Sequence, residues 1–172
     1  MNNSSNKTFE PDLIQGVNII ALELGNLQFD ESVLIITDHE TEFLGEIFEK
    51  ILIVKKYSIN HISIQPLKSH GESLPEHISK LMNSSDLIIG LTKSSMAHSK
   101  ERIMSEKYGS RYLSLPDYSE FILKHPSLRV NFKEIAKNAI HLSEKLSKAD
   151  KITIKTESGT DLELTVSGRN GN

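Results

Sequence analysis

Two spacings of hydrophobic residues alternate along the chain and predict alternating strands and helices. Continuous or alternating apolar stretches predict strands over residues 33–36, 61–64, 86–90 and 111–115. Apolar positions that recur every three or four residues predict helices over 11–24, 40–57, 74–82, 99–108 and 132–146. Strands that alternate with helices form a parallel sheet through right-handed crossovers. The predicted fold class is therefore α/β, with an open Rossmann-like or flavodoxin-like sheet and crossover helices.

The pattern changes after Asp150. Residues 151–156 and 161–166 alternate polar and apolar side chains, and Ser158-Gly159 supplies a turn between them. This pattern predicts an antiparallel β-hairpin. Because an isolated hairpin is marginal in water, we expect this one to pair with another element or another chain.

The length of 172 residues fits one domain, and the apolar share of 37% and charged share of 25% are typical of globular proteins. No apolar run approaches the roughly 20 residues that a membrane span needs, and the polar start lacks a secretory signal, so we expect a cytoplasmic protein. The expected organisation is a flexible tail at 1–9, a parallel α/β domain at 10–149, and a hairpin that starts a missing carboxyl-terminal domain at 150–172.

The charge and the cysteine count exclude several function classes. A net charge of -3, without a basic patch, argues against nucleic acid as a partner. The absence of cysteine excludes thiolate catalysis, disulfides and cysteine-ligated metal. The seven histidines, at 39, 61, 70, 77, 98, 125 and 141, lack the spacing of zinc proteases, so no metal site is predicted for this chain alone.

The turn after the first predicted strand, Thr37-Asp38-His39-Glu40, contains no glycine loop for a phosphate. Its acids would repel a pyrophosphate at the start of the following helix, which disfavours dinucleotide binding. The turn can hold a cation, or its polar residues can cap the helix, and capping is the favoured interpretation.

The main candidate site follows the third predicted strand. Open parallel sheets bind ligands outside the carboxyl ends of their strands, and Ser94, Ser95, His98 and Ser99 place hydroxyls and an imidazole there. These groups suit an anion, a carboxylate or a carbonyl. Helix capping by Ser95 or Ser99, with His98 on the surface, explains the same residues and is favoured by the spacing alone. A serine nucleophile has less support, because no acidic partner is specified.

With these residues in view, the chain resembles the amino-terminal domain of a superfamily that contains the aminopeptidase T metallo-aminopeptidases and the dihydroxypyridine ring-cleaving dioxygenases. The resemblance covers nearly everything from Leu13 to Arg169. Its landmarks are the opening helix, Glu31 to Asp38, Asp86 to Thr92, Ser95 to Arg102 for the family's Ser-x-Thr-His-Thr-x-x-Arg, Gly109 to Arg111, Ser114 to Pro116, and Gly159 to Leu162. Ala97 stands where the family has threonine.

The resemblance implies that the metal ligands belong to a carboxyl-terminal domain beyond the hairpin. This chain then binds no cofactor itself, and a divalent zinc, cobalt or iron ion would arrive only with that domain. The resemblance also implies that the amino-terminal domain contributes to a cleft and a homodimer. In the dioxygenase branch it implies an acid/base role for the residue matched by His98.

These observations lead to three hypotheses. The first is a non-catalytic binding or assembly module, stand-alone or truncated, in which Ser94, Ser95, His98, Ser99 and Arg102 line a site for a peptide or small molecule. Such a module would form a homodimer, or bind a partner chain, through its hairpin. The alternative is a fragment of a metal-dependent aminopeptidase or ring-cleaving dioxygenase whose metal domain is missing or supplied by another chain.

The third hypothesis is a signalling domain that resembles a response regulator. It rests on fold class alone, because Asp38 lacks the acidic pair expected just before the catalytic site of such a receiver.

Overall fold

The computed structural model describes residues 9–171 and divides into two compact units. Unit 1 is Met1–Arg129 and unit 2 is Val130–Asn172. The predicted tail at residues 1–9 lies outside the described residues, apart from Phe9. Within the described residues, no helix is both long enough and apolar enough to cross a membrane.

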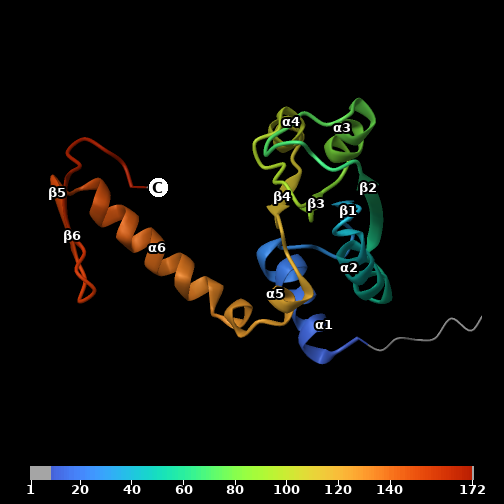
Figure 1. The fold of residues 1–172 in the computed structure, drawn as a ribbon, viewed down its shortest axis with the longest axis horizontal. Helices are drawn as coiled ribbons and strands as arrows, with labels where there is room; N and C mark the ends of the chain where they lie inside the picture. The colour runs from blue at the N-terminus through green and yellow to red at the C-terminus, as the bar shows by residue number, and fades with distance from the viewer. Residues whose placement is uncertain (1–8, 172) are drawn as a thin grey trace, which may run out of the picture. The chain divides into compact units, whose positions relative to one another are not determined.

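Unit 1 contains a parallel four-stranded sheet (Figure 1). Its strands are β1 (Ser32–Asp38), β2 (Ser58–Ile64), β3 (Leu87–Gly90) and β4 (Arg111–Ser114), in the order β2-β1-β3-β4. A parallel sheet covered on both faces favours continuous apolar strands, and the buried run in β1 meets that requirement. The predicted α/β class with a parallel sheet is confirmed.

Helices cover both faces of this sheet. They are α1 (Pro11–Asn18), continued by the π-helical η1 (Ile19–Leu24), α2 (Glu42–Val54), α3 (Glu76–Asn83), α4 (Lys100–Lys107), α5 (Glu120–Lys124) and the 3-10 helix η2 (Pro126–Arg129). Side chains alternate along β1 between two cores: Val33 and Ile35 pack in the core with residues of α1, α2 and α5, and Leu34 and Ile36 with residues of α3. The elements α5 and η2 were not predicted from the sequence.

Unit 2 contains α6 (Phe132–Ser147) and an antiparallel hairpin of β5 (Lys151–Lys155) and β6 (Asp161–Thr165). The predicted hairpin is confirmed. The compact units divide between residues 129 and 130, and the expected domain boundary at 149/150 stays a prediction. Within unit 2, Ser143 Oγ donates to the Gly171 carbonyl and the Gly171 amide donates to Ser147 Oγ, each at 2.9 Å.

The carboxylates of Glu31 and Asp86 connect the amino ends of β1, β3 and β4 in unit 1. Arg111 forms a bidentate pair with Glu31, at 2.9 and 2.5 Å. Asp86 accepts hydrogen bonds from the amide and the hydroxyl of Ser32, both at 2.8 Å, and so joins β3 to β1. The hydrogen bond from Arg111 holds the pKa of Glu31 below its usual value, and the bonds from Ser32 do the same for Asp86.

These depressed pKa values predict loss of stability in acid. Each carboxyl has a lower pKa in the folded chain than in the unfolded chain, so its stabilisation is complete above the unfolded values of about 4. The stabilisation is lost as the pH falls through the lower folded values. We expect urea unfolding from pH 7 to pH 3 to show a smaller decline in the free energy of unfolding for Asp86→Asn than for the wild type. An exposed control, Glu23→Gln, should keep the wild-type decline, and identical curves for all three proteins would contradict the assignment.

Candidate functional site

The carboxyl ends of β1 and β3 define the place where a ligand would be sought in unit 1. The chain passes from β1 outward to β2 and then returns to β3 on the other side of β1, which makes this pair the switch point of the sheet. Sheets of this kind bind ligands in the crevice at that point. The loops at 38–41 and 91–99 border it.

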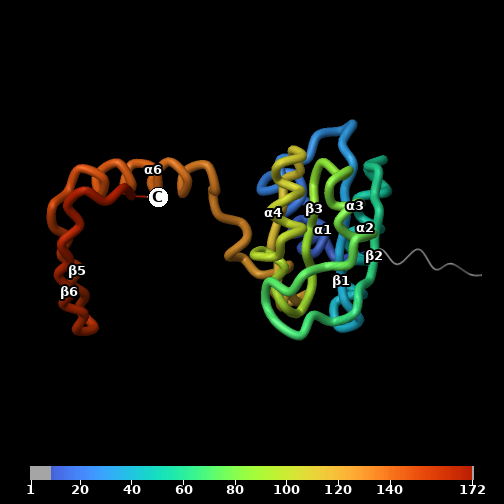
Figure 2. The backbone as a smooth tube through the Cα atoms, turned by 90° about the horizontal axis from the view of Figure 1, so that it is seen from above, coloured from blue at the N-terminus to red at the C-terminus, as the bar shows by residue number. Residues whose placement is uncertain are grey.

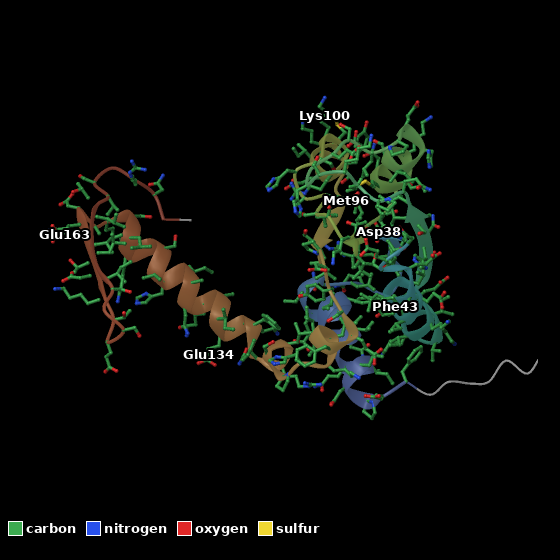
Figure 3. All side chains as sticks on the ribbon, in the orientation of Figure 1. Asp38, Phe43, Met96, Lys100, Glu134 and Glu163 are labelled. Atoms are coloured by element: carbon green, nitrogen blue, oxygen red, sulfur yellow. The ribbon has the colours of Figure 1, made fainter. Side chains whose placement is uncertain are left out.

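Asp38 lies at the end of β1 and is fully buried (labelled in Figure 3). Its carboxylate accepts hydrogen bonds from the Glu40 amide at 3.1 Å, the Thr41 hydroxyl at 3.0 Å and the Lys93 amide at 2.7 Å. The Thr41 hydroxyl therefore bonds to Asp38, although Thr41 occupies the N-cap position of α2. Asp38 thus links the two loops at the switch point by accepting from both.

Two of the predicted site serines, Ser95 and Ser99, form hydrogen bonds that stabilise the β3–α4 loop. Ser99 is buried at the N-cap of α4, where its hydroxyl accepts from the Arg102 amide at 3.2 Å. The Ser95 hydroxyl accepts from the Ala97 amide at 3.1 Å and shares a hydrogen bond of 3.1 Å with the hydroxyl of Ser114. The capping interpretation therefore describes Ser99, and the Ser95 hydroxyl bonds to residues of the β3–α4 loop and of β4.

The other predicted residues lie nearby without sharing one cluster. His98 is exposed and Ser94 is partly buried in the same loop. Arg102 lies in the first turn of α4. Its guanidinium forms an ion pair of 3.1 Å with Glu106 and lies 5.8 Å from the ring centroid of Tyr112. Burial raises the pKa of the Tyr112 phenol.

Sequence reasoning missed three residues at this edge. His70, on the loop before α3, accepts from the Ser95 amide through Nδ1 at 2.9 Å, so this histidine contacts the loop that carries the exposed His98. Lys93 Nζ forms an exposed ion pair of 2.5 Å with Asp117, and that hydrogen bond raises the pKa of Lys93. The partners lie 24 or 25 positions apart in each case, so no local pattern could reveal them.

A hydroxyl, an imidazole and a carboxylate line up elsewhere in unit 1. The Thr37 hydroxyl lies 2.9 Å from Nε2 of His61, and Nδ1 of His61 lies 3.4 Å from a Glu49 carboxylate oxygen. Thr37 is fully buried, so a substrate cannot reach its oxygen. A Cβ atom at Gly45 would lie 2.2 Å from the His61 ring, which explains why α2 carries glycine there. The contacts of Thr37, His61 and Glu49 therefore connect β1, β2 and α2 and have a structural role.

Unit 2 presents a different candidate surface. Among the described residues, the buried hydrophobic side chains end at Leu128, before this unit begins. Six large aliphatic side chains in unit 2 are between 42% and 62% exposed: Ile135, Ile140, Leu142, Ile154, Leu162 and Leu164. We call these six residues the unit 2 apolar surface.

The register of the hairpin separates its apolar and charged faces. Ile152 pairs with Leu164 and Ile154 with Leu162, which places four aliphatic side chains on one face. The opposite face carries the ion pairs Lys151–Glu163, at 2.7 Å, and Lys155–Asp161, at 3.1 Å (Glu163 is labelled in Figure 3). Figures 1 and 2 show the hairpin leaving the carboxyl end of α6 rather than lying along it, and Ile154, Leu162 and Leu164 on the apolar face are 42% to 44% exposed.

No family model, curated protein or solved structure matches this chain.

Proposed function

We propose that this chain is a non-catalytic assembly module that associates with a second copy of itself through the unit 2 apolar surface. The observation that carries this proposal is the absence of a buried hydrophobic residue among the described residues of unit 2, although its hairpin carries four aliphatic side chains on one face. A segment of 43 residues needs a core, a metal, a disulfide or a partner to be stable. The chain contains no cysteine, which rules out a disulfide, and we infer that a partner supplies the burial.

A second copy suits this surface in both polarity and charge. Unit 2 contains seven Lys and Arg residues and six Asp and Glu residues, so two copies meet with almost no net repulsion. Apolar faces that pack against each other across a two-fold axis form an isologous contact, in which the same residues serve both partners. The charged face of each hairpin then remains in water.

Light scattering on the purified chain tests this proposal. We expect a mass above that of a monomer for the wild type, and a lower mass for the double variant Ile154→Lys/Leu162→Glu. The two introduced residues face each other across the hairpin, so they can form a cross-strand ion pair that preserves the strands while it removes the apolar face. A matched control, Thr153→Lys, lies on the charged face opposite Glu163 and should keep the wild-type mass.

A monomeric wild type would contradict the proposal, and so would an unchanged mass in the double variant. Metal analysis and a peptidase assay on the same sample address the enzyme-fragment alternative. A stoichiometric metal with metal-dependent peptidase activity would show that the chain is catalytic and would replace the assembly proposal.

A further inference from the structure

Strand β2 forms an edge of the sheet that has no local protection. It pairs with β1 on one side only, and Figure 2 shows it at the margin of unit 1. Its seven residues, Ser58–Ile64, include no Lys, Arg, Asp, Glu or Pro. An edge strand exposes unpaired amides and carbonyls, and proteins usually guard such edges with charges, proline or a bulge.

The other outer strands of the described chain do carry such guards. Strand β4 begins at Arg111 and is followed by Pro116 within two residues of its end. In the hairpin, β5 has a lysine at each end, and β6 contains Asp161 and Glu163. Among these outer strands, only β2 therefore lacks a charged residue or proline at its edge. It is also as long as the central strand β1.

Charges on the adjacent helix indicate what pairs with this edge. Helix α2 packs on β2, and the contact of Glu49 with His61 places the middle of the helix over the middle of the strand. Because α2 connects β1 to the parallel β2, it runs opposite to β2. Its acidic start at Glu42 therefore lies toward the Ile64 end of β2, and Lys55 and Lys56, just after the helix, lie toward the Ser58 end.

Antiparallel pairing of β2 with another β2 brings unlike charges together. The Ser58 end of one strand then faces the Ile64 end of the other, so Lys55 and Lys56 of each copy approach Glu42 of its partner. These three side chains have no ion pair within the described residues. The strands themselves add no like-charge repulsion, since neither carries an acid, a lysine or an arginine.

We propose that β2 is a second assembly surface, which pairs antiparallel with β2 of another copy to form a continuous eight-stranded sheet. This inference goes beyond the unit 2 contact and does not depend on it. Two isologous surfaces on one chain build assemblies larger than a dimer. The wild type is therefore expected to exceed the dimer mass when both surfaces operate.

The test uses the full chain carrying Ile154→Lys/Leu162→Glu, so that only the β2 contact remains. This protein is expected to have the mass of a dimer by light scattering. Adding Asn60→Lys or Asn60→Glu should each give a monomer, because Asn60 is exposed on β2 and the same charge then appears on both strands. An equimolar mixture of the two charged variants should restore the dimer, and the neutral Asn60→Gln should never lose it.

The mixture separates a lost contact from a misfolded chain, since a misfolded chain would not regain a partner. A monomer for the starting double variant, a dimer for Asn60→Lys, or a mixture that stays monomeric would overturn the β2 proposal. None of these results would affect the unit 2 proposal, which rests on the difference in mass between the wild type and the double variant.

Discussion

Replacing Phe48 with alanine is expected to lower the free energy of unfolding of unit 1 by about 3 to 5 kcal/mol. Phe48 lies on the inner side of α2, is fully buried, and belongs to the core that β1 and β3 share with α1 and α5. Its removal loses apolar burial and leaves a cavity that backbone on both sides of the core prevents from closing. Urea unfolding followed by circular dichroism measures the change.

Phe43 provides the matched control on the same helix. This phenylalanine is 51% exposed and lines an open groove between α1 and α2. Phe43→Ala removes the same atoms from a partly hydrated position, so we expect a loss below about 1 kcal/mol. Equal losses for the two variants would mean that α2 faces the core through a different side.

Replacing Gly16 with alanine is expected to destabilise unit 1 by about 2 to 3 kcal/mol, although alanine is the better helix former by about 1 kcal/mol. A Cβ atom at Gly16, on α1, would lie 2.0 Å from the carbonyl oxygen of Leu123, on α5. The opposing atoms are backbone, so a side-chain rotation cannot relieve the clash. The glycine permits the close approach of these two helices.

Thermal unfolding of Gly16→Ala should show a lower midpoint than the wild type. The control is Glu23→Ala, in the helical segment that continues α1, where the side chain is exposed and a change within about 0.5 kcal/mol is expected. A rise in stability for Gly16→Ala, as helix propensity alone predicts, would show that α1 and α5 are not held together as described.

Local patterns were sufficient to predict most of the fold. The apolar run in β1 and the alternation in β5 and β6 each determine an element by themselves, because burial on two faces or on one face imposes a distinct spacing. The short α5 and η2 were not predicted, since five and four residues contain too few turns to establish a helical period. The grouping of α6 with the hairpin could not be predicted either, because an amphipathic stripe does not specify what it packs against.

The candidate site was less predictable than the fold. The alternative that a serine caps the fourth helix followed from its position before Lys100, and the structure places Ser99 in that role. The role of Asp38 could not be anticipated in full, because its shortest hydrogen bond comes from the Lys93 amide, 55 positions away. The unguarded edge of β2 depends on strand order, which the alternation of elements leaves open.

The absence of a buried hydrophobic side chain from the described residues of unit 2 has a consequence for the lifetime of the chain. A segment without buried hydrophobic side chains opens without unfolding the rest of the protein, so in a single copy the amides of α6 would exchange rapidly with deuterium and proteases would cut there first. Assembly through this surface would slow both processes. Turnover in a cell would then depend on concentration, with unassembled copies degraded and assembled copies retained.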